Sequence, residues 1–210
     1  MGGGLFLKDN GLFVKKYSQI PDALMNHQIV KEGNPSYGGM SGRDIMALVT
    51  GLKTIHREDY LDFRVNQVKE FGDAMLKKGI PILTPTGGHA IYMDVNKFFQ
   101  DTNMKPGDFG GVSFTAILLA AYGHRACELG NFAFGSYDPI TKTKKFPEVN
   151  FVRFAVPRLR YEKQDLDSVA EAVKGIYDLR KEIPGVNVVY GKDLVLRHFK
   201  ARFEFKNQSS

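Results

Sequence analysis

Arg153 is the residue whose sequence neighbours point most clearly to a binding role. It lies in the run Phe-Val-Arg-Phe-Ala-Val, residues 151–156, which has the composition of a strand. Because successive strand residues face opposite sides, Phe151, Arg153 and Ala155 share one face. A guanidinium among apolar neighbours must be paired, since an isolated buried charge is very costly, and its fork suits a carboxylate. The sequence leaves open a bound carboxylate, a structural ion pair, or water at an edge strand.

His198 is the second candidate, in the stretch Leu-Arg-His-Phe-Lys-Ala-Arg-Phe, residues 196–203. In a strand, Phe199 and Phe203 would share one face and His198 would lie on the other, among basic residues. The ring is then a solvated side chain, a polar group that lines a pocket, or a proton carrier. His89 follows two glycines, and we expect a core or turn histidine held by backbone hydrogen bonds.

Several other kinds of site have no signature in the sequence. The five histidines and the single cysteine are scattered without the spacing of a zinc site. No glycine loop of the Walker or dinucleotide type is present. Cys127 lies in an apolar run that reads as a helix, so we expect an inert buried thiol.

The composition is that of an ordinary globular protein, with 43% hydrophobic and 25% charged residues. No apolar stretch approaches the roughly 18 residues of a membrane span, and no signal peptide is visible. With one cysteine and no disulfide, we expect a cytoplasmic protein without a membrane partner. The net charge of +6 could attract nucleic acid. A solvated face is preferred, because the concentrated basic residues match no nucleic-acid motif; they are Arg197, Lys200, Arg202 and Lys206.

The candidate residues Arg153 and His198 are positioned by predicted helices and strands that alternate along the chain. Helices are predicted at residues 41–56, 59–78, 112–129 and 166–181, with a capping box at Ser41 and Asp44 and a stop at Gly79. Strands are predicted at residues 4–7, 81–83, 89–95, 150–156, 186–190 and 195–205, with a turn or short helix at 11–17 and a glycine-rich loop at 32–42. This mixture predicts an α+β or α/β domain with helices packed on a sheet.

Short segments of the chain resemble the tryptophanase and tyrosine phenol-lyase family over nearly its whole length. The order and spacing of the segments carry the resemblance, since each is weak alone. They are Gly3-Gly4, Pro35-Ser-Tyr-Gly-Gly39, Gly42-Arg43-Asp44, Gly87-Gly-His-Ala90, Arg125-Ala-Cys-Glu-Leu-Gly130, Val152-Arg153, Val156-Pro157-Arg158 and Val195-Leu-Arg-His-Phe199.

The resemblance implies the C-terminal part of an aspartate-aminotransferase-type (fold type I) enzyme, which is α/β with an α+β small domain. Residues 1–55 would be a remnant of the large cofactor domain with a connecting helix, and residues 56–210 the small domain. Members of this family are tetramers that use pyridoxal 5'-phosphate and a monovalent cation, K⁺. They split an aromatic amino acid into the arene, pyruvate and ammonia.

The resemblance also assigns substrate-binding roles. Arg153 matches the position that binds the substrate α-carboxylate, and His198 matches a histidine near the indole in tryptophanases. Leu129 is apolar where the phenol-lyases carry an arginine. The last two features indicate a protein closer to tryptophanase, with tryptophan as the substrate.

One departure limits what the chain can do. In the family the Schiff-base lysine lies in a Ser-x-Lys-Lys segment just before the strand that opens here, so we expect no catalytic and no cofactor-binding residue in this chain. The protein supplies anchoring and orientation to such a cofactor, and we expect no turnover by the chain alone. It would work with an N-terminal companion; the alternative is a non-catalytic remnant that binds a full-length lyase.

Overall fold

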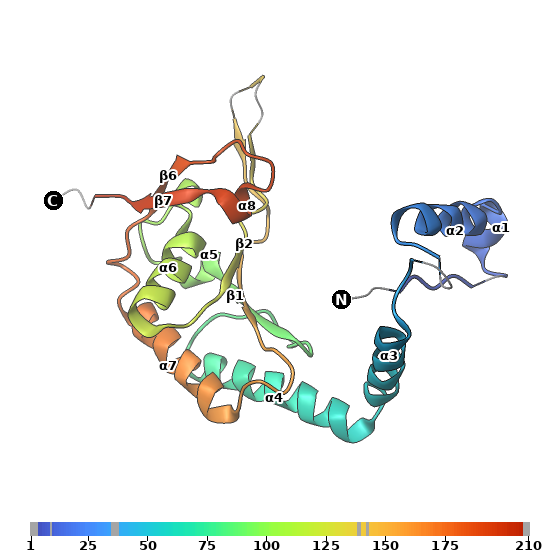
Figure 1. Ribbon diagram of the computed structural model, residues 1–210. Coiled ribbons are helices and arrows are strands. Elements are labelled where there is room, and N and C mark those ends of the chain that lie inside the picture. Colours follow the sequence, from blue (N-terminus) through green and yellow to red (C-terminus); the bar gives the residue numbers. More distant parts are fainter. Residues whose placement is uncertain (1–3, 9, 35–37, 138–139, 142, 208–210) are drawn as a thin grey trace. The chain divides into compact units, whose positions relative to one another are not determined.

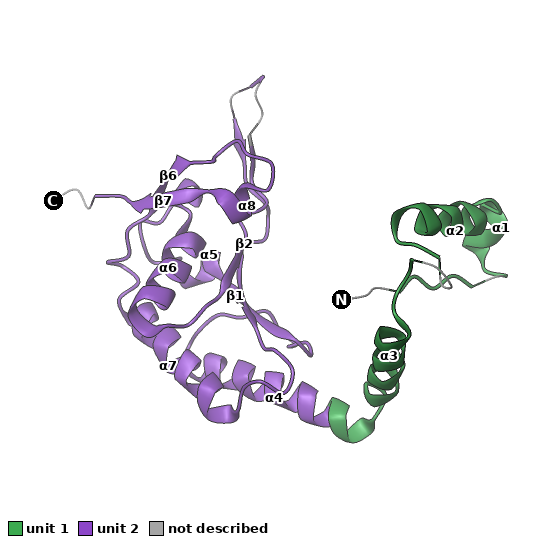
Figure 2. Cartoon of the chain, in the orientation of Figure 1, with its two compact units in different colours: residues 1–61 green, residues 62–210 purple. Residues whose placement is uncertain are grey.

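The computed structural model describes residues 4–8, 10–34, 38–137, 140–141 and 143–207 (Figure 1). The chain divides into two compact units, Met1–Leu61 and Asp62–Ser210 (Figure 2). Residues 35–37 of the predicted glycine-rich loop lie outside the described residues, as does Gly3.

The first unit is helical, and none of its described residues is buried. It contains α1 (Leu12–Lys16), α2 (Ile20–Lys31), α3 (Gly42–Thr54) and the start of α4 (Glu58–Lys77). The predicted cap of α3 is confirmed, because Ser41 Oγ accepts a hydrogen bond from the Asp44 backbone N–H at 3.2 Å. The predicted strand at residues 4–7 is wrong, since residues 4–8 are exposed and have no regular structure. Helix α2 was not predicted, because its apolar residues are spread around the helix instead of forming one stripe.

A three-stranded antiparallel sheet is the centre of the second unit. Its strands β1 (Ala90–Asp94), β5 (Phe151–Ala155) and β2 (Cys127–Leu129) follow the order β1-β5-β2. The predicted strands at residues 89–95 and 150–156 are thereby confirmed. The predicted strand at residues 81–83 is reduced to one isolated bridge between Ile82 and Met93.

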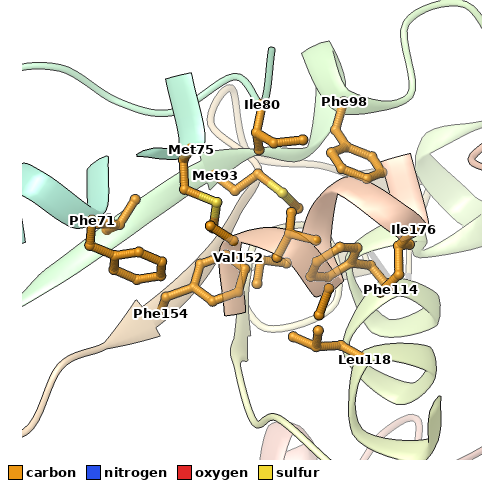
Figure 3. Close-up of a cluster of buried hydrophobic side chains, with 14 of the residues drawn as sticks. Phe71, Met75, Ile80, Met93, Phe98, Phe114, Leu118, Val152, Phe154 and Ile176 are labelled. Atoms are coloured by element: carbon orange, nitrogen blue, oxygen red, sulfur yellow. The ribbon is translucent and has the colours of Figure 1, made fainter. Parts of the chain in front are cut away.

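Helices cover one face of this sheet and form the core with it. They are α4, α5 (Val95–Phe98), α6 (Gly110–Tyr122) and α7 (Lys163–Asp178), with the 3₁₀ turn η1 (Pro106–Asp108) before α6. Figure 3 shows the core, in which side chains from these helices pack against side chains of the sheet. The helices contribute Phe71, Met75, Phe98, Phe114, Leu118 and Ile176, and the strands contribute Met93, Val152 and Phe154. The predicted packing of helices on a sheet is confirmed. Among the described residues, no helix is both long and apolar enough to cross a bilayer.

The predicted single helix at residues 112–129 is wrong in its last third. Helix α6 ends at Tyr122, where Gly123 adopts a left-handed conformation at φ 73°. Its N–H bonds the Leu119 carbonyl oxygen at 3.0 Å, which closes the last turn. The chain then leaves the helix, so Cys127 and Leu129 lie on β2 instead of on a helix.

The C-terminal part of the second unit carries two small antiparallel hairpins. They pair β3 (Ser136–Tyr137) with β4 (Lys144–Lys145), and β6 (Val186–Tyr190) with β7 (Arg202–Phe205). The predicted strand at residues 195–205 is wrong in its first half, which forms the short helix α8 (Arg197–Lys200). This helix follows Leu196, whose left-handed φ of 60° breaks the extended chain.

Candidate functional site

The two faces of the β1-β5-β2 sheet differ in burial. Along β2, β5 and the part of β1 from Ile91 onward, a buried residue alternates with a less buried one, as expected for a sheet covered on one side. The covered face carries Ile91, Met93, Glu128, Val152 and Phe154. The other face carries Tyr92, Cys127, Leu129, Phe151 and Arg153, all half-buried. The open face is therefore where a ligand could reach the sheet.

Arg153 lies in the middle of this open face. Its register partners are Tyr92 on β1 and Cys127 on β2, so one row crosses all three strands. The Arg153 Nε atom is buried and has no hydrogen-bond partner among the described residues. A buried donor left unpaired is costly. The sequence left open a bound carboxylate, a structural ion pair or water as the partner of Arg153. No ion pair of Arg153 is found in the described part of the chain.

Leu129 supplies an apolar neighbour on the same face. It is two residues beyond Cys127 on β2, and it is in register with Phe151 on β5. The Phe151 ring meets the Tyr92 ring edge-on, with 6.0 Å between centroids. A guanidinium is thus bordered by an aliphatic and two aromatic side chains.

His198 reaches this site from α8. Its Nε2 lies 3.5 Å from Cys127 Sγ, and its Nδ1 lies 3.9 Å from Glu128 Oε2. The ring also packs edge-on against the Phe199 ring, at 5.1 Å between centroids. The side chain is 22% exposed, so the solvated alternative for His198 does not hold. Its expected place on a strand is wrong, because it lies on α8.

Glu128 is a buried carboxylate that anchors this corner. Its Oε1 accepts from the Phe132 N–H and its Oε2 from the Ala133 N–H, each at 3.0 Å. Burial raises the pKa of Glu128, against those two N–H groups and the nearby His198, which lower it. The side chain is therefore oriented from both oxygens by the backbone.

Cys127 is half-buried, and burial raises the pKa of its thiol. The Glu128 charge raises it further, while the Arg153 charge lowers it. A raised pKa keeps the thiol protonated, as expected for an inert thiol, but Cys127 is only half-buried and not buried as predicted. The helical setting predicted for it is wrong.

The structure thus places Arg153 and Leu129 on one face of the sheet and brings His198 to the β2 edge of that sheet. The link is Cys127, which is in register with Arg153 and touches His198. Sequence reasoning missed Cys127 and Tyr92 as members of this site. Their signal was strand alternation, and for Cys127 it was hidden by the apolar run before it.

Two other predictions concern polar residues away from this corner. His89 was expected in the core or in a turn, and it is exposed in a bend, which fits the turn alternative. Its carbonyl oxygen accepts from the Val156 N–H at 2.9 Å. Three of the four concentrated basic side chains are engaged. Arg197 donates to the Phe132 carbonyl oxygen at 2.9 Å, and Lys206 donates to Asp108 at 2.5 Å. The Arg202 guanidinium lies over the Tyr190 ring, 5.7 Å from its centroid.

The described residues do not fit pyridoxal phosphate. A Schiff-base lysine needs an amine that is desolvated and uncharged. No described lysine is buried, and the half-buried Lys78, Lys174 and Lys206 each form an ion pair with a carboxylate. Within the described ranges, no three His, Cys, Asp or Glu side chains gather as a metal site would require.

Comparisons with known proteins identify relatives along the whole chain, although no protein-family model matches it. The tyrosine phenol-lyase of Lacrimispora saccharolytica is 34% identical over 207 residues, covering 99% of this chain and 42% of that protein. The tyrosine phenol-lyase of Nostoc punctiforme is 34% identical over 206 residues, covering 98% of this chain and 42% of that protein. The tryptophanase of Hyphomonas neptunium is 34% identical over 204 residues, covering 97% and 42%. The chain thus spans less than half the length of these relatives, and the identities do not separate the two names.

Proposed function

Because the chain belongs to the tyrosine phenol-lyase and tryptophanase family and spans only part of its relatives' length, we propose that it is the C-terminal portion of a lyase that splits L-tryptophan into indole, pyruvate and ammonia. In this proposal the chain binds the substrate. A companion N-terminal segment holds pyridoxal phosphate, its lysine and K⁺, within a fold type I enzyme of the cytoplasm. The chain alone is then inactive.

The observation that carries the proposal is the buried Arg153 Nε atom, which has no hydrogen-bond partner among the described residues. The side chain is fixed in the central strand and is half-buried on the open face. The substrate α-carboxylate would supply the missing acceptor in the planar geometry that a guanidinium prefers. Such a bond would orient the amino acid before any chemistry takes place.

The surroundings of Arg153 favour an indole over a phenol. Leu129 offers no hydrogen bond to a phenolic hydroxyl, and Phe151 adds further apolar surface. A phenolic hydroxyl buried against Leu129 would lose its hydrogen bonds to water there, which is costly. These residues support tryptophan as the substrate, with His198 at the edge of the side-chain pocket.

The first unit supports a companion segment. Helix α3 carries a stripe at the spacing of one helix face, made of Ile45, Leu48, Val49 and Leu52, and each of these is 38–47% exposed. No described residue of this unit is buried, so the stripe contacts no core of its own. We therefore assign residues 1–55 to the large domain of the complete enzyme and residues 56–210 to its small domain, within an oligomer.

A chimera tests the proposal. The segment of the Hyphomonas neptunium tryptophanase that aligns with this chain is replaced by the chain itself, and indole release from L-tryptophan is assayed. We expect indole from the chimera and none from the chain alone. Cofactor absorbance reports whether the chimera folds and loads. A loaded chimera that releases no indole would contradict the proposal.

The exposed α3 stripe also favours a second candidate function, a non-catalytic partner of a full-length lyase. This role needs association without turnover by the chain. Size-exclusion chromatography of the chain mixed with the full-length Hyphomonas neptunium tryptophanase tests it. A monomer that never co-elutes with the lyase removes this candidate.

A further inference from the structure

His198 straddles the edge strand of the sheet and contacts both of its faces. Cys127 and Glu128 are successive residues of β2, so their side chains point to opposite faces. The His198 ring nevertheless lies near both, with Nε2 3.5 Å from the thiol sulfur and Nδ1 3.9 Å from the carboxylate. This is possible because β2 is an outer strand of the sheet, with β5 on its one paired side. In Figure 1, α8 lies beside this edge.

The two neighbours of the ring have different hydrogen-bonding capacity. The thiol stays protonated, since burial raises its pKa, and an S–H is a weak donor. Two atoms lie within reach of the S–H: the carbonyl oxygen of its neighbour Glu128 at 3.7 Å, and His198 Nε2 at 3.5 Å, which accepts only in the tautomer that leaves Nε2 unprotonated. The ring nitrogen is the closer of the two.

The carboxylate imposes the opposite demand on the other ring nitrogen. Both Glu128 oxygens already accept backbone N–H groups, so Glu128 is oriented as an acceptor. At 3.9 Å the gap to Nδ1 is too long for a hydrogen bond, but an oxygen that is oriented as an acceptor favours an N–H over a lone pair on Nδ1. Thiol and carboxylate therefore favour the same proton position.

We propose that the Cys127 thiol donates to Nε2 and holds the neutral His198 ring in the tautomer that carries its proton on Nδ1, which makes Cys127 a positioning residue. Isolated histidine prefers the opposite tautomer, so the surroundings must impose this one. Both ring nitrogens then face the chain's own groups. The ring borders the site with its carbon edge and shapes the pocket without transferring a proton. That last role rests on the function proposed above, whereas the tautomer does not.

Nitrogen NMR on the ¹⁵N-labelled chain tests the tautomer without any turnover. The chain has five histidines, and His198→Gln identifies the His198 signals by their loss. We expect an unprotonated Nε2 and a protonated Nδ1 in the wild type. Cys127→Ala should move the proton toward Nε2, and Cys127→Ser, which keeps a donor, should restore the wild-type pattern. A protonated Nε2 in the wild type, or a Cys127→Ala ring identical to it, would overturn the proposal.

Alkylation provides a second measurement should Cys127→Ala fail to fold. The chain has one cysteine, so iodoacetamide reports on Cys127 alone. A protonated thiol reacts slowly, and His198→Gln should leave that rate nearly unchanged. The contrary result is a wild type that reacts fast and a His198→Gln variant that reacts about tenfold or more slowly. A tenfold change corresponds to one pKa unit of thiolate stabilisation, and Cys127 and His198 would then form an ion pair. The proposed tautomer would then be wrong. Both measurements stand whether or not a chimera releases indole.

Discussion

Gly130→Ala should unfold the corner that holds the candidate site. Gly130 directly follows β2, and a Cβ there would lie 1.9 Å from Asn150 Oδ1 and 3.0 Å from Asn150 Cα. Asn150 cannot move freely, because it is buried. Its Oδ1 accepts from the Asn131 N–H at 3.2 Å, and its Nδ2 donates to Asn96 Oδ1 at 2.9 Å. The new methyl group must displace this side chain.

The cost follows from these two hydrogen bonds. Each contributes about 1 kcal/mol net, and the buried Asn131 N–H left without an acceptor costs about 1–3 kcal/mol. The lower chain entropy of alanine in the unfolded state offsets about 0.4–1 kcal/mol. We expect Gly130→Ala to lower the free energy of unfolding by about 2–4.5 kcal/mol.

Urea unfolding followed by circular dichroism measures this change. The matched control is Gly87→Ala, because a Cβ at Gly87 meets no atom within 4 Å; we expect a change within about 0.5 kcal/mol. Wild-type stability in Gly130→Ala would refute the reasoning about Asn150.

Three further predictions concern other parts of the second unit. Gly111→Ala should destabilise the chain by about 1–2 kcal/mol in the same urea assay, because the new Cβ would lie 2.9 Å from Glu128 Cγ. A gain in stability would show instead that the Glu128 side chain moves aside without cost. Burial opposes ionisation of Asp108, but its pKa is lowered because Lys206 and the Lys105 N–H bond the carboxylate. The carboxylate therefore contributes to folding stability above its unfolded-state pKa, and this contribution is lost as the pH falls through the folded-state pKa. Asp108→Asn should be less stable than the wild type at pH 7 and equally stable in acid, and a stability difference that persists in acid contradicts this. Alkylation of Cys127 should reach half its maximal rate at a higher pH than that of a free cysteine, since burial raises its pKa, and a lower midpoint would show a stabilised thiolate.

Local patterns predicted most of the elements of the second unit. The strand at residues 150–156 and the end of α4 at Gly79 were predictable because alternation and glycine act within a few residues. The break after Tyr122 was not, because an apolar run fits a buried helix and a buried strand alike. Gly123 was the one available signal for it.

The candidate site was predictable one residue at a time. Arg153 and His198 could be singled out from their own stretches of sequence, and the family resemblance added Leu129 and a role for His198. The contact between His198 and Cys127 joins residues 71 apart in the chain. Such a contact depends on tertiary packing that no local pattern encodes, so Cys127 was missed.

The central claim is that Arg153 binds a carboxylate, and inhibition of the chimera by indole-3-propionate tests it most directly. Loss of a charged hydrogen-bond pair costs about 3 kcal/mol, or about a hundredfold in affinity. We expect Arg153→Ala to weaken inhibition by indole-3-propionate to this extent and to leave inhibition by indole, which has no carboxylate, unchanged. The exposed Arg160→Ala is the control. Equal inhibition of the wild type and Arg153→Ala by indole-3-propionate would contradict the account.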